Sequence, residues 1–98
     1  MIVVVDGASG QVSLADERNL TALSVTLQGC DAAAAAGTLG ALGRIDGEHA
    51  WLDIAGLRAL SPLSADPDWL AGFAAAMAYA SSKGWTDAAG THVRAHLS

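Results

Sequence analysis

Hydrophobic and polar positions alternate with a period of two in the first part of the chain. Residues 2–5 are a β-branched run (Ile-Val-Val-Val), residues 12–14 read Val-Ser-Leu, and residues 23–27 read Leu-Ser-Val-Thr-Leu. This alternation is typical of half-buried strands. Turn-forming residues at 6–10 (Asp-Gly-Ala-Ser-Gly) separate the first two segments, which predicts a β-hairpin. We therefore expect three strands in a small meander within the first 28 residues.

The middle of the chain predicts a helix, a strand and a short helical turn. Five consecutive Ala residues from position 32 favour a helix over 32–42, because Ala has the highest helix propensity. Asp31 is suited to cap its N-terminus, and Gly43 to end it. An Asp-Gly turn at 46–47 then predicts a strand over 49–54. A helical turn over 55–60 is expected to end before Pro62.

The period changes to that of a helix in the last third. Asp66 and Pro67 form a well-defined helix start. The bulky residues Trp69, Phe73 and Met77 then recur at helical spacing. This pattern predicts a helix over 69–80, and the Lys-Gly-Trp sequence at 83–85 is expected to end it.

A second helix is expected over residues 87–97, completing a C-terminal helical hairpin. Its buried stripe would contain Ala89, Val93 and Leu97. The predicted fold is α+β: a small, mainly antiparallel sheet of three to four strands, covered by two to three helices, in a single domain over residues 1–98. The alternative is a mixed sheet in which the Ala-rich helix crosses between strands. Strand order and register stay open.

Composition narrows the classes of partner. The net charge of −5 and the single Lys argue against nucleic acid and against anionic membrane surfaces, because both need clustered basic residues. The single Cys excludes an internal disulfide and a Cys-based zinc knuckle. The opening residues lack a signal-peptide pattern, and no apolar run approaches the roughly 18 residues of a membrane span. We expect a cytoplasmic protein without a cofactor, a nucleic-acid partner or a membrane partner.

One region combines a base with carboxylates. His49 lies beside Asp46 and Asp53, and a general acid–base pair needs such groups within hydrogen-bond reach. In a strand, His49, Trp51 and Asp53 share one face. They are therefore candidate catalytic residues, together with Asp46, and Trp51 is a candidate ligand-binding residue. The alternative is the solvated face of an edge strand, with Asp53 capping the helical turn that follows.

A second candidate site is a histidine pair. His92 and His96 are four residues apart, so on the predicted final helix both imidazoles lie on one face. That spacing supplies two ligands of a zinc or nickel site, and the candidates for a third ligand are His49, Asp87 and Cys30. The alternative is that both histidines face solvent.

The helix over 69–80 is apolar on both sides. Trp69, Phe73 and Met77 form one stripe, and Ala residues fill the opposite face. A helix that is apolar all round is usually buried on both sides, so we expect a homodimer, the commonest assembly, with these three residues at the interface. The alternative is that the stripe belongs to the core of the chain itself. The leading hypothesis is a non-enzymatic protein-interaction or small-ligand-binding module with a protein or small-molecule partner. The alternatives are a small accessory enzyme using His49 and a metal-binding protein using His92 and His96.

Overall fold

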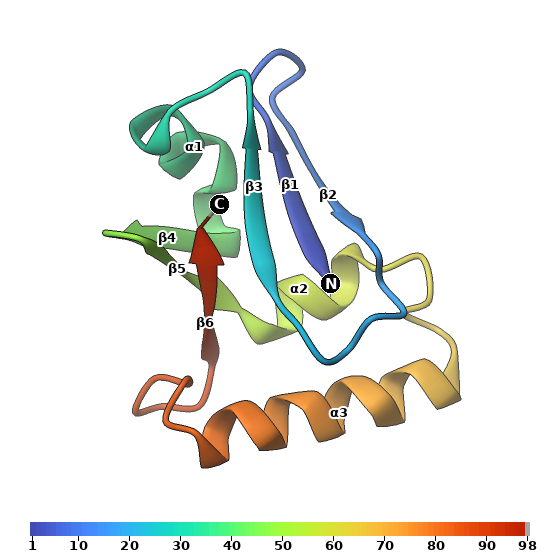
Figure 1. Ribbon diagram of the computed structural model, residues 1–98. Coiled ribbons are helices and arrows are strands. Elements are labelled where there is room, and N and C mark those ends of the chain that lie inside the picture. The colour runs from blue at the N-terminus through green and yellow to red at the C-terminus, as the bar shows by residue number, and fades with distance from the viewer. Residues whose placement is uncertain (98) are drawn as a thin grey trace.

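Figure 1 shows the computed structural model, which describes residues 1–97. In that range the chain forms one six-stranded sheet in the order β2-β1-β3-β6-β5-β4. The strands are β1 (Ile2–Asp6), β2 (Gln11–Ala15), β3 (Ser24–Gln28), β4 (Gly43–Asp46), β5 (His49–Asp53) and β6 (His92–Leu97). The fold is α+β, but the predicted sheet of three to four mainly antiparallel strands is wrong.

The sheet is mixed because two antiparallel units meet through parallel pairs. The predicted hairpin is confirmed, since β1 pairs antiparallel with β2. At the other end β4, β5 and β6 form antiparallel pairs. Between them β3 runs parallel to both β1 and β6. The alternative mixed sheet therefore describes the molecule better, and the Ala-rich helix does cross from β3 to β4.

The three helices of the described range are α1 (Ala32–Leu39), α2 (Ile54–Leu60) and α3 (Pro67–Ser82), with a 3-10 turn η1 (Gly40–Leu42) after α1. Asp31, Asp53 and Asp66 cap their N-termini. Each carboxylate accepts a hydrogen bond from a backbone amide of the first turn at 2.9–3.0 Å. The α1 helix ends earlier than predicted because Gly40 leaves it at a φ of 53°, a backbone conformation suited to glycine. None of these helices is long and apolar enough to cross a membrane.

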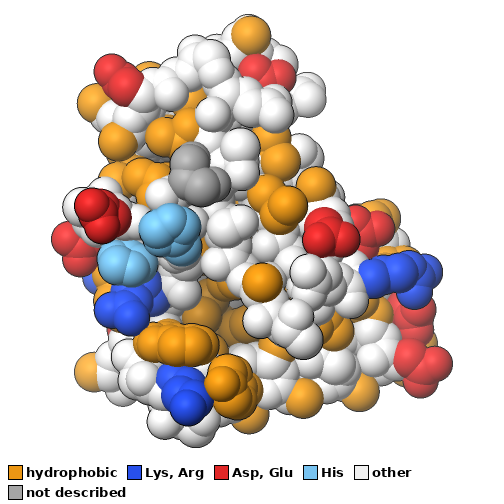
Figure 2. Space-filling view, viewed as in Figure 1, with side chains coloured by type: hydrophobic (Ala, Val, Ile, Leu, Met, Phe, Trp, Pro, Cys, Tyr) orange, Lys and Arg blue, Asp and Glu red, His pale blue; other side chains and the backbone are white. Residues whose placement is uncertain are grey.

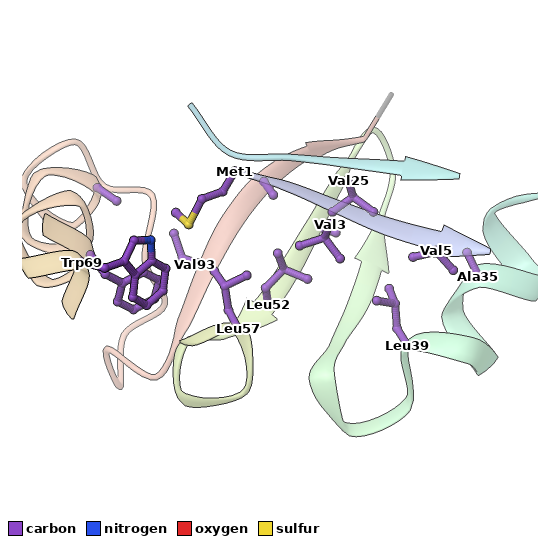
Figure 3. Close-up of a cluster of buried hydrophobic side chains, with 14 residues drawn as sticks. Met1, Val3, Val5, Val25, Ala35, Leu39, Leu52, Leu57, Trp69 and Val93 are labelled. Carbon is purple, nitrogen blue, oxygen red and sulfur yellow. The ribbon is translucent and has the colours of Figure 1, made fainter. Parts of the chain in front are cut away.

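The hydrophobic core lies on one face of the sheet. Figure 3 shows buried side chains from the strands meeting Leu39 of α1, Leu57 of α2 and Trp69 of α3. The strand residues with the least exposure are Val3, Val5, Val25, Ala50, Leu52, Val93 and Ala95. The α1 and α2 helices lie behind the sheet in Figure 1, and α3 runs across its lower end. No helix of the described chain covers the other face.

The predicted C-terminal helical hairpin is wrong, because residues 92–97 form β6. The segment reads His-Val-Arg-Ala-His-Leu, a strict alternation of polar and apolar residues. Val93 and Leu97 are four apart, so they share a face in a helix as well as in a strand. Ala95, only 2 % exposed, completes the period of two. Pairing with both β3 and β5 supplies β6 with backbone partners on each side.

Candidate functional site

The uncovered face of the sheet brings together residues from distant parts of the sequence. In the β5–β6 register His49 lies opposite His96, and Trp51 lies opposite Arg94. In the β4–β5 register Arg44 lies opposite Trp51. Figure 2 shows histidine side chains gathered on this face with Lys or Arg side chains on one side of them and Asp or Glu side chains on the other. The sheet therefore places imidazole, indole and guanidinium groups side by side.

A hollow of about 230 Å³ opens on this face. We call it the His–Arg hollow, and its lining is Leu23, His49, Trp85, Arg94 and His96. The two imidazole centroids are 6.1 Å apart, with their planes at 77°. Across residues 1–97, no hydrogen bond or ion pair engages the guanidinium of Arg94. Among the described residues no carboxylate lines the hollow, so the Arg94 guanidinium gives it a positive charge on a chain of net charge −5.

A second hollow of about 290 Å³ adjoins the first, because Leu23, Trp85 and Arg94 line both. We call it the aromatic groove. Tyr79 is 57 % exposed and Trp85 is 38 % exposed, and their rings meet edge to face at 5.9 Å. The Lys83 ammonium lies 5.5 Å from the Tyr79 ring, within the range of a cation–π contact. The groove therefore offers apolar and aromatic surface directly beside Arg94.

Backbone hydrogen bonds position the residues that the two hollows share. At the end of α3, Gly84 adopts a φ of 78°, and the Trp85 amide donates to the Ala80 carbonyl at 2.9 Å. This is the usual way in which a glycine ends a helix. The Arg94 amide then donates to the Trp85 carbonyl at 2.7 Å. The end of α3 and the strand β6 are thus tied together where Trp85 and Arg94 meet.

The predicted acid–base group is not assembled. Asp53 caps α2 through the Gly56 amide, as the alternative interpretation expected. The Asp46 carboxylate accepts a hydrogen bond from the Trp51 indole at 3.3 Å. In the part of the chain that the structure describes, neither carboxylate makes a hydrogen bond or an ion pair with His49. Of this group only His49 lines the His–Arg hollow.

Trp51, the predicted ligand-binding residue, lies on the uncovered face but outside the two hollows. The Arg44 guanidinium lies over its ring at 5.6 Å, and Asp46 accepts its indole N–H. These contacts occupy both the ring face and the donor. Trp51 therefore supports the sheet surface next to the hollow and does not line it.

The predicted pairing of His92 with His96 depended on a helix that does not form. Four residues along a strand span about 13 Å, too far for one metal ion. His92 instead pairs with Asp87, with Nδ1 3.3 Å from Oδ2. Hydrogen bonds from the backbone of His92, then from Thr91, lower the pKa of Asp87. Among the described residues, no group of three or more His, Cys, Asp or Glu side chains is arranged to hold a metal.

Two of the three predicted interface residues are inside the chain. Trp69 and Phe73 are 5 % and 2 % exposed and stack on each other at 5.1 Å. The Trp69 indole also donates to the Glu17 carbonyl at 2.7 Å. These two residues therefore have no surface to offer a second subunit. Met77 is half-buried and lines the aromatic groove.

Sequence reasoning missed Trp85 and Arg94 as candidate site residues. The polar positions of the alternating segment 92–97 carried the signal for Arg94, since they fall on one face once the segment is a strand.

Comparisons with known proteins identify no relationship: no family model, no curated protein and no solved structure matches the chain.

Proposed function

We propose that this chain is a small-ligand-binding module whose His–Arg hollow receives a compact anionic group, a carboxylate or a phosphate. One observation carries the proposal. An unpaired guanidinium and two imidazoles converge on a hollow in which residues 1–97 place no carboxylate, in a chain with twice as many acidic as basic residues. Concentrating positive charge in an acidic protein favours a negatively charged ligand at that place.

The chemistry of the lining suits such a group. The Arg94 guanidinium is planar and donates two parallel hydrogen bonds to a carboxylate or a phosphate. Each imidazole of His49 and His96 donates at least one further hydrogen bond. Trp85 offers a flat apolar surface against which a ring of the ligand packs. We therefore expect the ligand to combine an anionic group in the His–Arg hollow with an apolar part in the aromatic groove.

Calorimetric titration tests the proposal with phosphate, benzoate and phenyl phosphate as probes, in buffer containing EDTA. We expect phenyl phosphate to bind most tightly, because it occupies both hollows. Since a hydrogen bond to a charged group contributes about 1.5–3 kcal/mol, Arg94→Gln should weaken binding roughly tenfold or more. Arg58→Gln is the matched control, because Arg58 is exposed in α2 on the opposite face of the sheet. Equal binding by both variants, or no saturable binding of any probe, would overturn the proposal.

A homodimer is part of the same proposal, with a changed interface. The outward face of α3 carries the exposed residues Ala71, Ala74, Ala75 and Ala78, a flat apolar strip that a second copy of the helix suits. Native mass spectrometry should detect a dimer that Ala75→Glu converts to a monomer. A monomeric wild type at high concentration would refute the dimer.

The free thiol of Cys30 supports a reducing, cytoplasmic location.

A further inference from the structure

We propose that His49 and His96 together bind a divalent transition-metal ion of the zinc, nickel or copper class. The two residues lie directly opposite each other on the antiparallel strands β5 and β6. Both side chains are on the face that no helix covers, and their ring centroids are 6.1 Å apart. Neutral imidazole is the ligand that these metals share. Strand pairing therefore brings together two metal ligands that are distant in the sequence.

The distance between the rings is close to that of a shared ion. With metal–nitrogen bonds of about 2.0–2.1 Å, two imidazoles on one tetrahedral ion have ring centroids about 5 Å apart. The observed pair needs to close by about 1 Å. Within residues 1–97, neither ring is held by a hydrogen bond, so rotation of the side chains is available for this adjustment. Access is open, because both rings line the His–Arg hollow.

The third histidine of the chain is excluded from this site. His92 lies about 13 Å along β6 from His96, and its Nδ1 is engaged by Asp87 at 3.3 Å and by Thr91 at 2.9 Å. The metal partner of His96 is therefore His49 and not His92. His92 becomes an internal control, since it has the same chemistry on the same strand without a facing imidazole.

Two protein ligands leave the remaining coordination positions open. Structural and catalytic zinc sites use three or four protein ligands, so this ion is expected to exchange readily, with water in the other positions. Arg94 also lines the hollow, and its positive charge weakens the binding of a bare cation. The same guanidinium is placed to hold an anion that coordinates the ion. The metal-binding inference does not rest on the anion-binding proposal, because the observation behind it is the facing arrangement of His49 and His96.

The test titrates tag-free protein with Ni²⁺ or Zn²⁺ in a buffer free of phosphate and chelators. Calorimetry should give one ion per chain, and the ion should raise the Tm because it binds only the folded state. Losing the hydrogen-bond partner of a metal ligand already costs about 10- to 100-fold in affinity, so His49→Gln and His96→Gln should each cost at least about tenfold. His92→Gln should stay within about twofold of the wild type. Anion binding is measured separately in EDTA, so failure of one proposal is distinguishable from failure of the other.

Two outcomes would overturn the inference. One is that His92→Gln weakens binding as much as His96→Gln while His49→Gln has no effect. The other is that no histidine variant changes the titration. A measurement on the wild type protects the test against misfolded variants: paramagnetic Ni²⁺ should broaden the amide resonances around residues 49 and 96 first. Broadening centred on residue 92 would refute the His49–His96 pair.

Discussion

Replacing Trp69 with Phe removes a hydrogen bond that ties two distant segments of the core together. The Trp69 indole N–H donates to the Glu17 carbonyl at 2.7 Å, across 52 positions of sequence. It thereby holds the loop between β2 and β3 against α3. The ring is 5 % exposed and stacks on Phe73. A Phe ring preserves the stacking but leaves the Glu17 carbonyl without its donor.

The expected cost follows from these contacts. The Glu17 carbonyl is partly buried, and leaving it without its hydrogen bond costs up to about 1–3 kcal/mol; the smaller ring adds a cavity contribution. We therefore expect Trp69→Phe to lower the free energy of unfolding by about 2–3 kcal/mol, a large part of the total of about 5–15 kcal/mol usual for a domain. For a chain of this size that loss lowers the Tm by roughly 10–20 °C.

Urea unfolding followed by far-UV circular dichroism measures this cost, because tryptophan fluorescence changes with the substitution itself. Trp85→Phe is the matched control. Trp85 is 38 % exposed, and its indole nitrogen has no hydrogen bond in the described chain. The same chemical change there should alter the free energy of unfolding by about 0.5 kcal/mol or less. If the two variants unfold at the same urea concentration, the assignment of Trp69 as a core anchor is wrong.

Three further predictions use the same measurement of stability. Gly43→Ala should destabilise by about 1–3 kcal/mol, because the added Cβ would overlap the Trp51 carbonyl oxygen of β5. Gly37→Ala, in open space on α1, should stabilise by about 0.5–1 kcal/mol. Asp53→Ala should cost about 1 kcal/mol by removing the α2 cap, whereas Asp53→Asn should retain most of that stability, and equal losses would contradict the capping role. Because its pKa is lowered below the ordinary value of 3.8 in the folded state, Asp87 stabilises the fold above about pH 4, and this contribution disappears as the pH falls through the folded pKa. An acid titration of Asp87→Asn should lack that step, and an unchanged acid transition would refute the assignment.

The local sequence determined the elements whose signals lie within a few residues. Asp31 and Asp66 were identifiable as helix caps because a carboxylate next to a helical pattern satisfies first-turn amides wherever the helix packs. The hairpin of β1 and β2 was identifiable because turn formers separate two short β-type segments. The stripe of Trp69 and Phe73 correctly marked the buried side of α3. What that side packs against was not encoded locally, and the core of the same chain took the place of a second subunit.

Tertiary structure alone decided the final strand, and with it the candidate site. The spacing of Val93 and Leu97 by itself suits a helix and a strand equally. The alternation across residues 92–97 favours a strand, but six residues are too few for the pattern to settle the choice without the strands that pair with them. Residues 92–97 form a strand because β3 and β5 each present an edge with which β6 pairs, and the backbone N–H and C=O groups of a sheet need hydrogen-bond partners. That pairing moved His96 away from His92 and set it opposite His49. The sequence by itself therefore determined the caps, the hairpin and the buried stripe of α3, whereas contacts between distant segments decided which histidines, and which arginine, share a site.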